Sequence, residues 1–207
     1  MDNESSLLGG QTLSTVGRTL KSQAIILGGF VVLIWFLELI DMVIMDGSLD
    51  KLGVQPRSLT GLRGILFMPF LHNGLGHVVA NTIPFIVLGW LVMVRRMSDF
   101  LVVTAVVIVV SGLGVWLFGH SNSTHVGASG LIFGYFGFLL LRAYFERSLI
   151  AILVAIFVVF LYGGLIFGLS PLQIGVSWQA HLFGFIGGAL AAYWLTKNQE
   201  PKITILP

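Results

Sequence analysis

Two long apolar stretches of this chain begin with the runs Gly127-Ala128-Ser129-Gly130 and Ala180-His181-Leu182-Phe183-Gly184. Each run places a polar side chain near the start of a segment long enough to enter a lipid bilayer. Polar groups inside a membrane are costly and usually functional. Serine and histidine are also the nucleophile and the general base of acyl-transfer enzymes. The two runs therefore predict a membrane protein whose helices bring a hydroxyl and an imidazole together.

Composition indicates a membrane protein rather than a soluble domain. Of the 207 residues, 56% are hydrophobic and 10% are charged, whereas a soluble domain carries about 25% charged residues. The net charge of +2 is too small to indicate a nucleic-acid-binding protein, which carries an excess of basic residues. Because the chain has no cysteine, it has neither disulfides nor thiol chemistry. No nucleic acid and no cofactor is expected, and nothing in the sequence specifies an oligomeric state.

The apolar residues are gathered in blocks of about 20, the length that crosses a bilayer. They predict an all-α, polytopic bundle in which residues 24–196 form one membrane domain with a long first loop at 46–75. Residues 1–23 are predicted to be a disordered polar tail, and 197–207 a C-terminal tail. The first block is too long for a removable signal peptide and is interpreted as an anchor. Six spanning helices are expected at 24–45, 76–94, 99–119, 126–142, 148–168 and 178–196.

The basic residues predict the orientation of this bundle. Six helices place both termini on one side, and that side would hold eight of the eleven Lys and Arg residues, the other three lying in the loop 46–75. Cytoplasmic loops carry the excess of Lys and Arg, so both termini are expected in the cytoplasm. The second, fourth and sixth helices then run from outside to inside. The eight residues are Arg18, Lys21, Arg95, Arg96, Arg142, Arg147, Lys197 and Lys202.

Three of the expected helices carry polar residues at one depth. Counted from the basic residue that ends each helix, at about 1.5 Å per residue, Asn81, Ser129 and His181 lie about 20–24 Å above the inner end. In a hydrocarbon core of about 30 Å, they are expected very roughly 5–10 Å below the outer surface. Glycines four residues apart, beside Ser129 and again beside His181, predict that these two helices pack closely. The hydroxyl and the imidazole should therefore come within reach of each other.

This set of side chains predicts peptide hydrolysis. Ser129 is the candidate nucleophile and His181 its base, while Ser129 also offers an unpaired backbone N–H at the start of its helix. His77 and Asn81 share one helical face and can donate to the same oxyanion. No Asp or Glu lies at this depth on these helices, so a dyad without a carboxylate is expected. Phe133, one turn after Ser129, is expected to pack against the imidazole ring.

The same residues carry a family resemblance. Gly127-Ala128-Ser129-Gly130 resembles the Gly-x-Ser-Gly motif of rhomboid intramembrane serine proteases, and His181 followed by Gly184 is similar to that family's last catalytic helix. The run from His72 to Asn81 resembles its second-helix motif, and the match covers about residues 60–195. The resemblance implies a rhomboid-like fold and a Ser129–His181 dyad, with His77, Asn81 and the Ser129 N–H as oxyanion donors. Gly127, Gly130, Phe133 and Gly184 would support the site.

The resemblance also implies a substrate class and a location. The family's substrates are membrane-spanning proteins, which are cut near the outer surface, so the expected partners are such proteins and the lipid bilayer. Short loops favour a multi-pass protein of a prokaryotic cell membrane. Two positions depart from the family's common pattern: Leu62 precedes Arg63 where a Trp-Arg pair is frequent, and Phe133 stands where a Tyr is common. Neither departure removes a group that the chemistry requires.

Other interpretations of the same residues remain open. A catalytically inactive rhomboid-like protein would bind membrane helices without cutting them, and a small permease or channel would use the histidines as an ion path. His77 and Asn81 could instead tie the second helix to its neighbours. His72 lies just before that helix and is interpreted as loop-ordering. No metal site is expected, because His-Glu-x-x-His is absent.

Overall fold

The computed structural model describes residues 2–172 and 175–198, with side chains from Thr15 onward. Over these residues the regular secondary structure is helical, with one isolated bridge between Val54 and His125 in two of the connecting loops. The helices, in chain order, are α1 (Asp2–Ile40), η1 (Asp41–Met45), η2 (Leu49–Leu52), η3 (Thr60–Arg63), α2 (Gly64–Phe67), η4 (Met68–Phe70), α3 (Leu75–Met93), α4 (Met97–Phe118), α5 (Ser129–Glu146), α6 (Leu149–Tyr162), η5 (Gly163–Leu169) and α7 (Trp178–Lys197).

The fold is that of a multi-pass membrane protein. Within the described residues, four helical segments are long and apolar enough to cross a bilayer: Thr15–Met45, Leu75–Met93, Met97–Phe118 and Leu149–Leu169. The helices α5 and α7 fall outside this set because they carry the glycine stripes and several polar residues. In the bundle they lie side by side, and α5 also contacts α3, α4 and α6. Of the two, α5 is therefore the central helix of the bundle.

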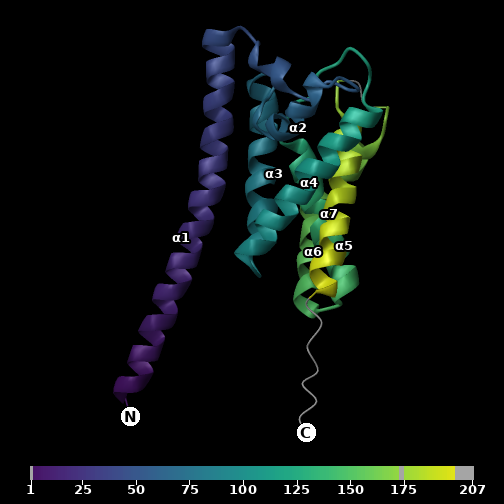
Figure 1. Ribbon diagram of the computed structural model, residues 1–207. Coiled ribbons are helices and arrows are strands. Elements are labelled where there is room, and N and C mark those ends of the chain that lie inside the picture. The colour runs from purple at the N-terminus through teal and green to yellow at the C-terminus, as the bar shows by residue number, and fades with distance from the viewer. Residues whose placement is uncertain (1, 173–174, 199–207) are drawn as a thin grey trace.

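Burial shows how differently the helices are placed. Every residue of α5 from Gly130 to Leu139 is buried, so protein surrounds this helix on all sides. By contrast, only Ala151 and Val158 are buried on α6, which lies at the periphery. The helix α1 stands to one side of the bundle in Figure 1, and it begins at the end of the molecule where α7 finishes. The loops that precede α5 and α7 meet at the opposite end.

Two boundaries differ most from those expected. The helix α1 begins at Asp2 rather than at residue 24, so residues 2–23 are helical where a disordered tail was predicted. This stretch contains no proline, and a helix already formed in the apolar part extends at little cost. The fifth predicted helix was expected to run to residue 168, but α6 ends at Tyr162 and continues as the 3₁₀-helix η5, beginning at the pair Gly163-Gly164. The predicted tail 197–207 lies outside the described residues beyond Asn198.

The long first loop is not a loose connection. It folds into the short helices η2, η3, α2 and η4, and Ile65 packs directly over Gly112 of α4. Its end reaches the start of α5, because Gly127 donates its N–H to the carbonyl of Met68 at 2.9 Å. The loop thereby supports the segment that leads into Ser129.

A buried ion-pair network closes the end of the bundle away from the loops that precede α5 and α7. Arg142 of α5 lies 3.0 Å from Asp99 of α4 and 2.9 Å from Glu146 on its own helix, and Glu146 also pairs with Arg95. Arg142 is 8% exposed and Asp99 is 2% exposed. Arg142 was expected as one of the basic residues on the cytoplasmic side, at the end of its helix. A charge so deeply buried needs a partner, and the network provides it.

Candidate active site

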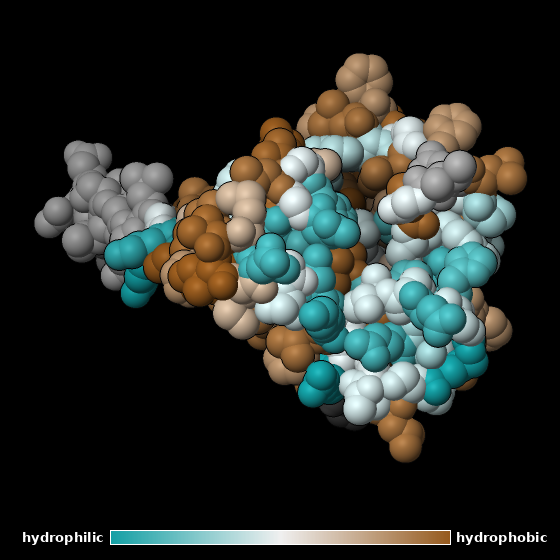
Figure 2. Space-filling view, turned by 90° about the horizontal axis from the view of Figure 1, so that it is seen from above, coloured by the Kyte–Doolittle hydropathy of each residue, from teal (hydrophilic) through white to brown (hydrophobic). Residues whose placement is uncertain are grey.

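A cavity of about 1080 Å³ opens at the end of the bundle where the loops meet. Seen from this end in Figure 2, hydrophilic side chains gather around a hollow and apolar ones project at the perimeter. The four predicted functional side chains all line this one cavity, and they come from three helices. His77 and Asn81 are on the first two turns of α3, Ser129 is the first residue of α5, and His181 is on the first turn of α7.

The glycine stripes account for the closeness of α5 and α7. A Cβ added at Gly184 would collide with the backbone of Gly130, and one added at Gly188 would collide with that of Gly134. The two helices therefore approach as closely as backbones can, as small residues permit. Ser111 of α4 supports the same contact, since its hydroxyl donates to the carbonyl of Ala180 at 2.9 Å. The helix α4 was expected from the apolar pattern, but this contact of Ser111 with α7 was not predicted.

The ring of His181 is held on one face and at one nitrogen. Phe133 stacks on it with ring centroids 3.9 Å apart and planes 6° apart, the packing expected from its position one turn after Ser129. The Nδ1 atom lies 2.9 Å from the carbonyl oxygen of Gly168, in the last turn of η5. A carbonyl can only accept, so Nδ1 carries the hydrogen and, in the neutral ring, Nε2 keeps a free lone pair. That nitrogen is the one that can act as a base.

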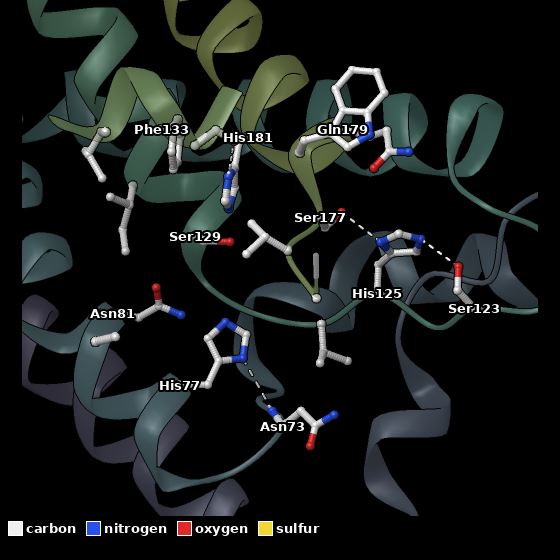
Figure 3. A pocket seen from close by; sticks show the side chains of 18 of the residues that line it. Asn73, His77, Asn81, Ser123, His125, Ser129, Phe133, Ser177, Gln179 and His181 are labelled. Carbon is white, nitrogen blue, oxygen red and sulfur yellow. Dashed lines mark hydrogen bonds between the residues drawn. The ribbon is translucent and has the colours of Figure 1, made fainter. Parts of the chain in front are cut away.

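Ser129 lies beside this ring in Figure 3, with its hydroxyl in the cavity. Among the described residues neither the hydroxyl nor the backbone N–H of Ser129 has a hydrogen-bond partner. A direct bond between Ser129 and His181, which the sequence predicted to be within reach, is therefore not formed here. Hydrogen bonds of this kind are often long in unliganded enzymes and shorten when substrate binds.

His77 and Asn81 present donors to the same space. The backbone N–H of Asn73 donates to Nδ1 of His77 at 3.5 Å, the long end of the range, so the hydrogen of the neutral ring is on Nε2. That atom lies against Gly127, where a Cβ would come within 2.7 Å of it and where φ is +122°. Only glycine fits this position. Asn81 is 6% exposed, and its Nδ2 has no partner within the described chain.

His72 has a supporting role just outside the cavity. Its Nε2 accepts the backbone N–H of Ala128 at 3.2 Å, directly before Ser129. Burial, together with the neighbouring His77, lowers the pKa of His72 to about 3. The ring therefore stays neutral and keeps the lone pair that this bond needs. The loop-ordering interpretation of His72 agrees with this contact.

The outer rim of the cavity is tied together by His125. Its Nε2 lies 2.9 Å from the hydroxyl of Ser123, and its Nδ1 lies 2.7 Å from the hydroxyl of Ser177, the residue that caps α7. Burial and the nearby His120 lower the pKa of His125. The loop before α5 is thus fastened to the start of α7, which fixes the two ends that carry Ser129 and His181.

The described lining contains no charged side chain. Two main-chain groups also belong to the site: the carbonyl of Gly168, and the N–H of Ala128, which is bonded to His72. They were not predicted from the sequence, because main-chain groups do not depend on residue type. Over the described residues no group of three or more His, Asp or Glu side chains is arranged to hold a metal ion. The arrangement can supply a nucleophile, a base with a free lone pair, and unpaired N–H donors.

Comparison with known proteins identifies the family of this chain. A family model for the Rhomboid domain matches residues 60–198. The uncharacterized protein Rv1337 of Mycobacterium tuberculosis is 40% identical over 205 residues, covering 92% of this chain and 85% of its own length. The uncharacterized protein ML1171 of Mycobacterium leprae is 42% identical over 179 residues, covering 83% of this chain and 70% of its own length. A Bacillus subtilis protein named as a candidate rhomboid protease, YdcA, is 29% identical over 133 residues, covering 64% of this chain and 66% of its own length.

Proposed function

This chain belongs to the rhomboid family, and we propose that it is an intramembrane serine endopeptidase that cuts membrane-spanning proteins near the outer surface. Ser129 and His181 are its catalytic dyad. The observation that carries the proposal is the convergence of Ser129, His181, His77 and Asn81 on one open cavity. Six helices cross the membrane, with α5 and α7 as the central pair and both termini in the cytoplasm, as the distribution of Lys and Arg favours. The bacterial relatives favour a prokaryotic cell membrane.

The first step is attack by Ser129 on the carbonyl carbon of the scissile peptide. Nε2 of His181 takes the hydroxyl proton, and the resulting imidazolium is stabilised by its Nδ1–H bond to Gly168. The carbonyl oxygen becomes an oxyanion. His181 then gives its proton to the leaving amine, which frees the first product and leaves an acyl-enzyme. A water molecule, activated by the same nitrogen, hydrolyses the acyl-enzyme and restores Ser129.

The oxyanion is stabilised by N–H groups that have no other task in the unliganded protein. The backbone N–H of Ser129 lies at the positive end of the α5 dipole. Nε2–H of His77 and Nδ2 of Asn81 converge beside Gly127, directly before the nucleophile. A buried donor without a partner costs about 1–3 kcal/mol. Asn81 is such a donor, and an oxyanion that forms only during reaction would supply the missing acceptor.

The experiment that tests this function is proteolysis in liposomes. The protein is reconstituted with a single-span membrane protein that has a helix-breaking segment near its outer end, and the fragments are identified by mass. We expect one cut in the outer part of the span, because the cavity opens at the end opposite to the predicted cytoplasmic termini. A cut in the inner part, or no cut in a series of such substrates, would contradict the proposal.

We expect Asn81→Ala to slow cleavage without abolishing it. Removing one oxyanion donor costs about 10²–10³-fold in turnover in other serine proteases, and the donors of His77 and Ser129 can reduce that loss here. The measurement is kcat and KM for the same substrate, and the decrease is expected in kcat. Asn73→Ala is the matched control, because Asn73 also lines the cavity but engages His77 only through its backbone. Equal kcat values for Asn81→Ala and wild type would remove this role.

A further inference from the structure

We propose that the main-chain carbonyl of Gly168 orients the catalytic base, the task that a carboxylate performs in a Ser-His-Asp triad. The inference rests on the proposed function, in which His181 is the base. It assigns a positioning role to η5, an element that no motif pointed to. It also makes the competence of the base depend on the position of η5 in the cavity wall.

Among the described residues that line the cavity, the carbonyl of Gly168 is the group that selects the tautomer of His181. The described lining has no carboxylate, so none can hold Nδ1–H. Phe133 stacks on the ring and fixes its plane, but a stacked ring does not determine which nitrogen carries the hydrogen. The hydrogen bond of 2.9 Å from Nδ1 to the oxygen of Gly168 places the hydrogen on Nδ1. It leaves the lone pair on Nε2, on the side of Ser129.

The carbonyl is free for this task because the residue three positions further on is Pro171, which has no N–H to donate to it. The next carbonyl back, that of Phe167, accepts the N–H of Ser170 at 3.1 Å, whereas that of Gly168 accepts from His181. Glycine is required at this position, since a Cβ would lie 2.6 Å from Cζ of Phe133 and 3.3 Å from Nδ1 of His181. Any side chain would push η5 away from the ring.

The same helix is part of the cavity wall. Gly164, Leu165 and Gly168 line the cavity, and a Cβ at Gly164 would meet no atom within 4 Å. The preceding helix α6 has two buried residues, Ala151 and Val158, and on η5 the side chain of Leu165 is only partly buried against the core. An outward displacement of η5 would therefore meet little packing resistance and would break the bond to Nδ1. The base is then oriented only while η5 is seated against α5 and α7.

The test weakens this one acceptor without altering a side chain. Replacing Leu169 by its α-hydroxy analogue converts the Gly168–Leu169 amide into an ester, whose carbonyl accepts hydrogen bonds poorly. Since one hydrogen bond is worth about 0.5–1.5 kcal/mol, we expect kcat to fall about 3- to 10-fold while KM changes little. In ¹⁵N spectra of protein labelled at histidine, the fraction of His181 with hydrogen on Nδ1 should fall. The matched control is the ester at Phe167, which also removes one N–H from η5 but leaves the Gly168 carbonyl in an amide.

The outcomes separate this inference from the proposed function. A wild-type kcat together with an unchanged Nδ1–H tautomer in the Leu169 ester would overturn the inference while leaving the protease intact. Equal losses in the two esters would also overturn it, because they would reflect a damaged helix. If the wild-type protein cleaves nothing, the proposed function fails, and the tautomer measurement alone decides whether Gly168 orients the ring.

Discussion

Ser129→Ala should abolish cleavage of a membrane-spanning substrate. The variant lacks the nucleophile, and Ser129 is the one hydroxyl in the cavity that lies beside His181 (Figure 3). In a serine protease of another fold, losing either the serine or the histidine costs on the order of 10⁶-fold in turnover. A loss of at least about 10⁴-fold is therefore expected, down to the background of the assay. The measurement is the rate of fragment release in liposomes that contain equal amounts of each variant.

Two further variants make this result specific. Ser22→Ala is the control, since its hydroxyl bonds to the carbonyl of Arg18 on its own helix, away from the cavity, and its loss should leave the rate unchanged. The double variant Ser129→Ala, His181→Ala should be no slower than Ser129→Ala alone, because the two side chains act as one unit. Cleavage by Ser129→Ala at more than a few per cent of the wild-type rate would refute its role as nucleophile.

Gly188→Ala should damage both stability and activity. A methyl group at this position would occupy the space of the Gly134 backbone, which cannot yield as a flexible side chain would. Overpacking a core typically costs about 1–3 kcal/mol, and the upper part of that range is expected where backbones are in contact. Because α5 carries Ser129 and α7 carries His181, forcing the helices apart also separates the dyad. The measurements are thermal unfolding in detergent and the cleavage rate.

Gly29→Ala is the matched control for that helix contact. Gly29 lies on α1, and an added Cβ would meet no atom within 4 Å. Alanine there should leave activity intact and raise stability by up to about 1 kcal/mol, because glycine loses more backbone entropy than alanine in a helix. If Gly188→Ala unfolds at the wild-type temperature, the close approach of α5 and α7 is wrong.

Side-chain patterns in the sequence predict much of this fold and site. The apolar blocks locate α3, α4, α5 and α7 to within a few residues, and the glycine stripes mark the contact between α5 and α7. Asn81, Ser129 and His181 share one expected depth, and the structure places all three around one cavity. The resemblance to rhomboid proteases is confirmed by the family match. These features are predictable because they depend on residue type and helical spacing.

What the sequence did not predict depends on backbone atoms and on contacts between distant segments. The carbonyl of Gly168 orients His181 across thirteen positions of the chain, and any residue has a carbonyl. The ion pair of Arg142 with Asp99 is likewise a contact between two helices, and a count of basic residues on each side does not reveal it. The change from α6 to η5 and the extension of α1 to Asp2 follow from local backbone preferences too weak to be seen in a hydropathy pattern.

The most direct test of the central claim is labelling with a fluorophosphonate, a probe that reacts with an activated serine hydroxyl. Mass spectrometry of the labelled wild-type protein should find the adduct on Ser129, with no adduct in Ser129→Ala and a rate reduced to background in His181→Ala. A folded wild-type protein that takes up no probe would be a family member that binds membrane helices without cutting them. Labelling at an unchanged rate in His181→Ala would contradict the claim that this imidazole activates Ser129.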